Sequence, residues 1–422
     1  MSLKRELGLL HATMMGLGST ICAGLFVILG PAVEIAGPAV ILSFLLCGVI
    51  NVATMLSYCE LGAAMPRMGG EYVYVMSAFE GLPSFITGWF EWSSNIFYGT
   101  LMVLGSAYLL HSITALNPYV IMGILVLAFT LINLRGIRSA GTAQTVLTIV
   151  LLAIVILFIG AGLMHGFKPN AFEPFMPQGS LSVIVAVAFI FETYVGVEAI
   201  AATQAEIKNP GRNIPRAMIL CSVLLIVLYT LVAFVAIGVV SPTALVSSLT
   251  PLNLVAETTM GSVGVVLITF AGLIAALTSL NSAMIASSRA ACAMGYSGHF
   301  PRCLRKVHGV FGTPYLAILF GSVIILLLSI VDNLEFIVYS INFGFLIGFS
   351  LVNLSLIKLR RSRPDMHRPF KTPLYPLGPI VGIATSIGLL AFFNLRSLAF
   401  GFAWGLLGML IYFYRRRGRK QP

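Results

Sequence analysis

The chain has 422 residues, of which 58% are hydrophobic and only 9% are charged. Because soluble globular domains carry about 25% charged residues, this composition excludes a chain built from soluble domains. A membrane-spanning helix requires about 20 predominantly apolar residues, and the charges of this chain are gathered in short stretches between long apolar runs. The sequence therefore predicts an all-α polytopic membrane protein.

Apolar segments of membrane-spanning length follow one another along the whole chain. Short polar stretches that contain most of the charged residues separate them. Twelve such segments can be counted, which predicts twelve transmembrane helices. They lie at residues 8–32, 37–65, 83–112, 118–134, 142–165, 181–203, 216–240, 262–290, 313–331, 334–357, 376–395 and 398–414.

The net charge of +11 is distributed unevenly over the gaps between these segments. Clusters of Lys and Arg occupy alternate gaps and both chain ends, whereas the other gaps carry only Lys168 and Arg396. Cytoplasmic loops of membrane proteins are enriched in Lys and Arg, so we expect a multi-pass protein of the cell membrane with both termini in the cytoplasm. Contact of the cluster Lys358–Lys371 with anionic lipid headgroups is a further interpretation of this charge. No nucleic-acid partner is expected.

The first and sixth segments differ from the others in their polar and small residues. The first crowds glycines at positions 16, 18 and 24 around Ser19 and Thr20, and the sixth places Gly196 between Glu192 and Glu198. Interrupted helices in corresponding positions of two halves indicate the binding site of a transporter. The alternative is that the glycines of the first segment form a face for close helix packing.

A helix interrupted inside the membrane leaves unpaired carbonyl groups on one side of the break and unpaired N–H groups on the other. In the first segment, the carbonyl groups are expected near Ser19 and Thr20, and the N–H groups near Ala23 and Gly24. The helix dipole makes these ends negative and positive. Small residues let a carboxylate approach the N–H groups, so the break favours a zwitterion such as an α-amino acid.

Four motifs resemble the amino acid–polyamine–organocation transporter family over most of the first ten segments. They are GSTICAGLF at 18–26, YCELG at 58–62 with GGEY at 69–72, YVGVE at 194–198 with EIKNP at 206–210, and SSR at 287–289 with its neighbours in the eighth segment. The resemblance implies the leucine-transporter fold, with inverted repeats at about 8–165 and 181–357 inside a transport core at 1–358. A cytoplasmic loop, two further helices and a basic tail then occupy 359–422.

The resemblance also implies where the substrate is bound. Three positions depart from the family pattern: Cys22 replaces a glycine, Glu192 replaces an aromatic gate, and Leu151 falls where many members have a lysine. In the family, that lysine is thought to take the place of a sodium ion. Because this chain lacks it, the resemblance does not by itself imply that transport is coupled in the same way. The implied substrate contacts are Ser19, Thr20, Ala23, Gly24, Glu192, Val195 and Gly196, with Ser94, Asn95, Tyr98 and Asn281 as further candidates.

Ionisable groups inside a membrane are costly and usually functional. Glu192 and Glu198 are therefore the predicted proton-coupling residues, with a structural hydrogen-bond role as the alternative for Glu198. Sodium coupling would instead use hydroxyl groups of the eighth segment, and exchange without an ion is a third option. The candidate sodium ligands are Thr278, Ser279 and Ser282.

Three other acidic residues receive structural interpretations. Glu91 lies between two tryptophans, which favours a place in an interfacial aromatic belt over a proton relay. Glu60, Arg67 and Glu71 at the end of the second segment are predicted to form an ion-pair network.

The function predicted from these features is secondary active transport of amino acids by alternating access, through proton symport or exchange. The alternative is a polyamine, diamine or basic amino acid exchanger of the same fold, which Glu192 would favour. No catalytic constellation, metal site or cofactor motif is found in the sequence. None of the six cysteines falls in an outside loop, so no disulfide framework is expected. The sequence does not determine the oligomeric state.

Overall fold

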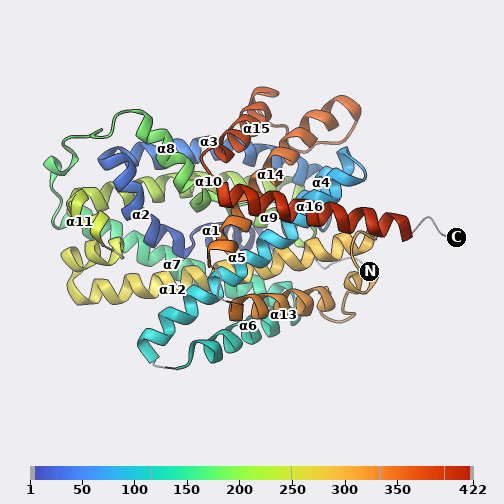
Figure 1. Cartoon of the computed structure of the whole chain (residues 1–422), viewed down its shortest axis with the longest axis horizontal. Coiled ribbons are helices and arrows are strands. Elements are labelled where there is room, and N and C mark those ends of the chain that lie inside the picture. The colour runs from blue at the N-terminus through green and yellow to red at the C-terminus, as the bar shows by residue number, and fades with distance from the viewer. Residues whose placement is uncertain (1–4, 115, 249, 332–333, 394, 419–422) are drawn as a thin grey trace.

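The computed structural model describes residues 5–114, 116–248, 250–331, 334–393 and 395–418. These residues form helices and no strand, apart from an isolated parallel bridge between Leu7 and Ile207. Most helices run along the long axis of the molecule, and both chain ends lie at the same end of this axis (Figure 1). The prediction of an all-α protein is confirmed.

The predicted apolar segments all fall on helices. The agreement is closest for α6, which spans Pro118–Leu134, and for α13, which spans Tyr315–Val331. The other helices are α1 (Leu9–Thr20), α2 (Ala23–Ala36), α3 (Val40–Ala64), α4 (Gly70–Ala78), α5 (Leu82–Thr114), α7 (Ile137–Met164), α8 (Leu181–Ile190), α9 (Ala199–Ala202), α10 (Pro210–Val239), α11 (Pro242–Ser247), α12 (Pro251–Tyr296), α14 (Leu334–Ser362), α15 (Leu377–Leu390) and α16 (Leu395–Gly418). Short 3₁₀ turns connect some of them, including η3 (Phe191–Tyr194), η4 (Gln204–Glu206) and η5 (Arg302–Arg305).

Several of these helices have the length and apolar composition needed to cross a bilayer. Shorter apolar helices, among them α6 and α13, accompany them. This is the organisation of an integral membrane protein, because a lipid environment requires backbone groups to be paired within helices. Within the described residues, the long apolar stretches are Ile28–Ala64, Arg138–Met164, Pro210–Val239, Pro251–Tyr296, Ile341–Ser362 and Leu398–Arg415.

Both predicted helix interruptions are present. The first lies between α1 and α2, where Cys22 adopts an extended conformation with ψ of 173°. The second lies between α8 and α9, where the chain passes through η3 and then Gly196, whose φ is +135°. Only glycine adopts such a φ without strain, so the sequence marks this break by the residue that the backbone requires.

Helix α1 lies inside the bundle, where it packs against α7, α9, α10 and α12. A side chain at Gly16 would meet Ile200 and the Sγ atom of Cys221 at 2.8 Å, and one at Gly18 would meet Nε2 of Gln144 at 2.6 Å. These glycines therefore let α1 approach its neighbours closely. The predicted packing face and the predicted break both exist, in the same helix.

The segment before α1 is tied to the loop that follows α9. The backbone N–H of Leu7 donates to the carbonyl of Glu206 (3.0 Å), and the N–H of Lys208 donates to the carbonyl of Leu7 (2.8 Å). The side chain of Glu206 forms an ion pair with Arg289 of α12 at 3.0 Å, and both side chains are almost fully buried. One connected set of contacts therefore joins the segment before α1, the loop after α9 and helix α12.

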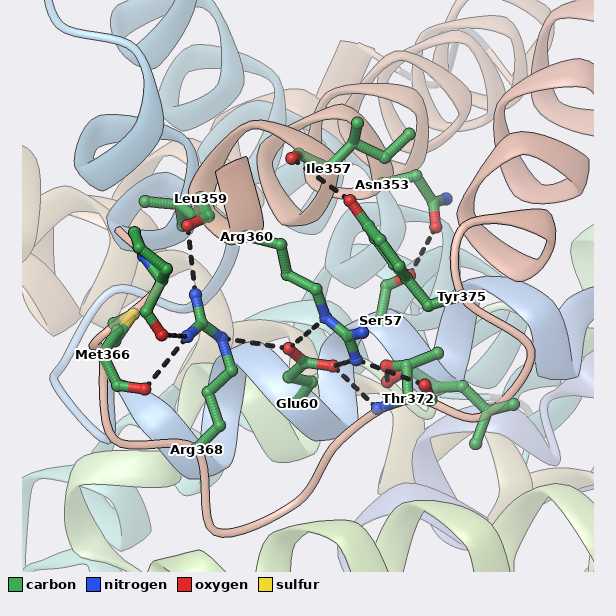
Figure 2. Close-up of polar contacts among 12 residues, drawn as sticks. Ser57, Glu60, Asn353, Ile357, Leu359, Arg360, Met366, Arg368, Thr372 and Tyr375 are labelled. Carbon is green, nitrogen blue, oxygen red and sulfur yellow. Dashed lines mark hydrogen bonds and ion pairs between the residues drawn. The ribbon is translucent and has the colours of Figure 1, made fainter. Parts of the chain in front are cut away.

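A second set of polar contacts, the Glu60 clasp, joins α3 to α14 and to the loop after it (Figure 2). Glu60 is fully buried, and its carboxylate accepts hydrogen bonds from Arg360 (2.9 and 2.6 Å) and from the N–H of Thr372 (2.7 Å). Arg368 forms a further ion pair with it at 3.2 Å. Glu60 thus pairs with these two arginines, and among the described residues it forms no ion pair with Arg67, contrary to the predicted network of Glu60, Arg67 and Glu71.

Replacement of Glu60 by glutamine should loosen this clasp. The variant keeps the size of the side chain but loses charge-assisted hydrogen bonds, which contribute about 1.5–3 kcal/mol to groups of this kind. We expect a lower thermal unfolding temperature of the detergent-solubilised protein and faster tryptic cleavage in the 363–372 loop. The exposed Glu80 provides the control, because Glu80→Gln should change neither measurement. An unchanged cleavage rate in Glu60→Gln would contradict the role of the clasp.

Candidate substrate site

The two helix interruptions touch each other in the middle of the bundle. A Cβ atom added to Gly196 would lie 2.7 Å from the carbonyl carbon of Ser19 and from the N and Cα atoms of Thr20. Such an approach is available only to glycine. The α8–α9 break therefore packs directly on the last residues of α1.

Hydroxyl groups from three other helices reach the carbonyl groups at the end of α1. The hydroxyl of Tyr98 donates to the carbonyl of Ser19 at 3.1 Å, and the hydroxyl of Ser279 donates to the same oxygen at 3.2 Å. Tyr229 of α10 donates to the carbonyl of Thr20 at 3.0 Å. These oxygens would otherwise lack intrahelical partners. A carbonyl oxygen has two lone pairs, and on Ser19 both are used by these hydroxyls, so an ammonium group can bind there only by displacing one of them.

A small cavity of about 10 Å³ lies beside this junction. A single water molecule needs about 10–15 Å³ on the same measure, so the cavity is too small for an amino acid and the structure is a closed state. Six elements of the bundle contribute to its wall. The lining residues are Ser19, Glu71, Glu91, Asn95, Tyr98, Val195, Gly196, Glu198, Ala199, Ala202, Ala286 and Phe345.

Many of the residues predicted to bind substrate or protons are brought together here. Those that line the cavity are Ser19, Asn95, Tyr98, Val195, Gly196 and Glu198. Thr20 lies against Gly196, and its own hydroxyl donates back to the carbonyl of Gly16 at 2.8 Å. Ala23 and Gly24 begin α2, and Glu192 lies in η3, but the surroundings of these three residues fall outside the described part of the structure.

Two of the predicted contacts face other parts of the bundle. The Ser94 hydroxyl lies against Gly344 of α14. Asn281 is fully buried and donates to Gln144 at 2.9 Å while it accepts from Asn133 at 3.0 Å. Asn281 therefore links α12 to α6 and α7 and is not among the residues that line the cavity. The sequence could not distinguish these roles, because a buried amide suits substrate binding and hydrogen bonding between helices equally well.

The three sodium candidates on α12 differ in their surroundings. Ser279 reaches the carbonyl groups of Gly18 and Ser19 at 3.4 and 3.2 Å. Thr278 donates to Ile274 and Ala275 of its own helix, and the buried hydroxyl of Ser282 has no hydrogen-bond partner among the described residues. Of these three residues, Ser279 is the one whose hydrogen bonds reach the end of α1.

On α7, the residues nearest to Gly18 are neutral. They are Gln144 and Thr148, and Thr148 also donates to the carbonyl of Met14 at 3.1 Å. Leu151, at the position where a lysine was considered, is fully buried. No lysine of the family type is present in α7.

Two acidic residues of the cavity wall, Glu71 and Glu91, were assigned structural roles from the sequence. Glu91 lines the cavity together with Asn95 and Tyr98 of the same helix. The spacing of these three residues is i, i+4 and i+7, which places them on one helix face, so the sequence contained a signal for Glu91. Glu71 lies on the separate helix α4, and nothing local indicated its position.

Local hydrogen bonds explain how two of the acidic side chains are held. The carboxylate of Glu91 accepts the backbone N–H of Tyr72 at 2.9 Å, in the first turn of α4, where N–H groups lack helical partners. The carboxylate of Glu198 accepts the N–H of Gly196 at 2.8 Å, inside the break. Among the described residues, no group of three or more His, Cys, Asp or Glu side chains is arranged to hold a metal ion.

The sequence matches a known family over nearly all of its length. A sequence model of the family described as amino acid permease matches residues 11–408. The chain is 29% identical to the branched-chain amino acid permease BcaP of Bacillus subtilis, over 99% of this chain and 95% of the relative. It is likewise 29% identical to the methylthioribose transporter of Bacillus subtilis, over 99% of this chain and 94% of the relative.

A third relative is the serine/threonine exchanger SteT of Bacillus subtilis, which is 27% identical over 97% of each chain. The three relatives are named as a permease, a transporter and an exchanger, and none is named as an enzyme. Together with the apolar helices and the paired helix breaks, these matches indicate a transporter embedded in a membrane. The chain belongs to the amino acid permease family of integral membrane transporters.

Proposed function

We propose that this protein carries α-amino acids across the cell membrane by alternating access, at the junction of the two helix breaks. The observation that carries the proposal is the packing of Gly196 against Ser19 and Thr20. This contact places the α8–α9 break on the carbonyl end of α1, and α2 begins three residues after Thr20. The first N–H groups of α2, at Ala23 and Gly24, suit the substrate carboxylate. The carbonyl of Ser19 suits the ammonium group once the hydroxyl of Tyr98 or of Ser279 moves away from it.

The closed cavity supports a cycle in which helices separate to admit substrate. Because the cavity holds about 10 Å³, an amino acid can enter only when part of its wall moves. In this proposal, the chain has twelve transmembrane helices, with repeats at about 8–165 and 181–357 and both termini in the cytoplasm. The Glu206–Arg289 ion pair and the Glu60 clasp then lie on the cytoplasmic side and open when substrate is released there.

Protons are the proposed coupling ions, with Glu198 and Glu192 as the residues that carry them. Glu198 is buried and lines the cavity, and a buried carboxyl favours its neutral form until a positive charge approaches. Coupling to sodium at Ser279, or exchange of one amino acid for another, are the competing mechanisms. A basic amino acid or diamine remains the alternative substrate class, since Glu192 would favour it.

The test is uptake by purified protein in proteoliposomes. The panel should contain labelled leucine, serine, lysine, putrescine and methylthioribose, because the names of the relatives cover several substrate classes. We expect saturable uptake and exchange of at least one α-amino acid, and no uptake of its amide derivative, which lacks the carboxylate. Absence of uptake and exchange for every amino acid tested would overturn the proposal.

A further inference from the structure

Three carboxyl groups from separate elements line the cavity beside the helix breaks. Glu71 comes from α4, Glu91 from α5 and Glu198 from the loop before α9. All three are buried, with exposed fractions of 3%, 6% and 8%. In the part of the chain that the structure describes, the ion pairs involve Glu60 and Glu206, so none of these three is paired with a Lys or Arg side chain.

Backbone N–H groups donate hydrogen bonds to only part of this group of three carboxyl groups. Glu91 accepts the N–H of Tyr72 and lies beside the N–H of Glu71, and Glu198 accepts the N–H of Gly196 and lies beside its own N–H. No backbone donor reaches the side chain of Glu71 among the described residues. Its polar neighbour is the hydroxyl of Tyr58, which is fully buried and has no hydrogen-bond partner of good geometry among the described residues. A buried hydroxyl of this kind needs a partner, and it lies beside the same carboxyl.

The surrounding chain makes room for these carboxyl groups. A side chain at Gly70 would meet the Oε1 atom of Glu91 at 2.8 Å, and one at Gly348 of α14 would collide with the Glu71 carboxylate. From the other walls, the cavity is faced by Tyr98 of α5 and by the uncharged Ala202, Ala286 and Phe345. The acidic group therefore faces a space that contains no positive side chain.

Three negative charges in one small cavity repel each other and lose their hydration, so the group requires neutralisation. We infer that Glu71, Glu91 and Glu198 form a subsite for one positive charge, continuous with the substrate cavity. The inference rests on the proposed function. The positive charge that binds to this subsite can come from two sources. Either a proton from solution binds to the group, or the substrate brings an ammonium or guanidinium group on its side chain.

The experiment compares the full-length wild type with Glu71→Gln, Glu71→Asp and Glu257→Gln in proteoliposomes. Glu257 is an exposed glutamate of α12 and serves as the matched control. For each variant, accumulation of leucine and of lysine is measured with and without a gradient of one pH unit, and exchange at equal pH is measured in parallel. One proton per substrate gives up to about tenfold accumulation under this gradient, since about 1.4 kcal/mol corresponds to a factor of ten.

With a proton as the source, Glu71→Gln should lower the ratio of gradient-driven leucine accumulation to leucine exchange about tenfold. With the substrate as the source, wild type should prefer lysine, and Glu71→Gln should lower lysine uptake at least about tenfold relative to leucine uptake. In either case, the ratio measured for Glu71→Asp should return most of the way to the wild-type value, because a carboxyl is present again. The ratio for Glu257→Gln should equal that of wild type. A loss of folding alone would lower all activities together, and Glu71→Asp would then show whether a carboxyl is needed.

Two results separate the inference from the function on which it rests. If wild type transports amino acids but Glu71→Gln keeps both ratios, or if uptake follows sodium alone in both proteins, the cation subsite is wrong and the transport function stands. If wild type transports no amino acid, the proposed function itself fails.

Discussion

Replacement of Gly196 by alanine is expected to abolish transport. The new Cβ atom would lie 2.7 Å from three backbone atoms of Ser19 and Thr20, where no flexible side chain can move aside. The φ of +135° adds to this cost, because such conformations cost about 1–3 kcal/mol for residues other than glycine. The two breaks must therefore separate, or α9 must shift, and either change displaces the cavity wall. Uptake in proteoliposomes should fall by more than about tenfold, which corresponds to about 1.4 kcal/mol.

Gly160 of α7 provides the matched control for this substitution. It lies in a regular helix, and an added Cβ atom would meet nothing within 4 Å. Alanine favours helices over glycine by about 1 kcal/mol, so Gly160→Ala should keep full uptake and normal thermal stability. Wild-type uptake by Gly196→Ala would show that the contact between the breaks is not required for transport.

Removal of Arg289 is the second change with a large expected effect. Its guanidinium donates to both carboxylate oxygens of Glu206, at 3.0 and 3.4 Å, and to Ser288 at 2.9 Å. Both members of the pair are at most 1% exposed. Loss of one partner leaves an uncompensated buried charge, which costs about 3–5 kcal/mol. Arg289→Met should therefore lower the thermal unfolding temperature strongly and release the segment before α1 from the loop that contains Glu206.

The double variant Glu206→Gln with Arg289→Met separates charge from packing. Because it removes both charges, it should recover much of the stability that Arg289→Met loses, and the double-mutant cycle should give a coupling energy of about 3 kcal/mol. Arg361→Met on the exposed end of α14 is the control and should leave stability unchanged. Additive effects of the two single substitutions would contradict direct coupling.

The acidic residues show what sequence patterns can and cannot locate. Glu198 could be assigned to the site because the YVGVE motif contains both the break and the carboxylate. Glu91 shares a helix face with Asn95 and Tyr98, yet its neighbouring tryptophans suggested a membrane interface. Those rings in fact stack inside the protein, with Trp89 against Trp404 at 5.1 Å. An interfacial aromatic belt and a buried aromatic cluster contain the same residue types, so the sequence alone does not distinguish them.

The Glu60 clasp shows the same limit over a longer distance. The sequence placed Glu60 near Arg67 and Glu71 because they are neighbours along the chain. In the structure its partner Arg360 lies 300 positions away. Glu71, eleven residues after Glu60, faces the cavity instead. No local pattern reports which distant helix will lie opposite a given side chain.

The sequence by itself determined where the helices lie, where two of them break, and that the chain is a membrane transporter of the amino acid permease type. These are local properties, since the length of an apolar run and the presence of Gly196 act within a few residues. Only the tertiary structure decided that Glu71 lies with Glu91 and Glu198 in the cavity wall, and that Glu60 binds two arginines. It also decided that Asn281 forms hydrogen bonds with α6 and α7. These pairings depend on how distant helices pack, and a buried charge takes whichever partner that packing brings within reach.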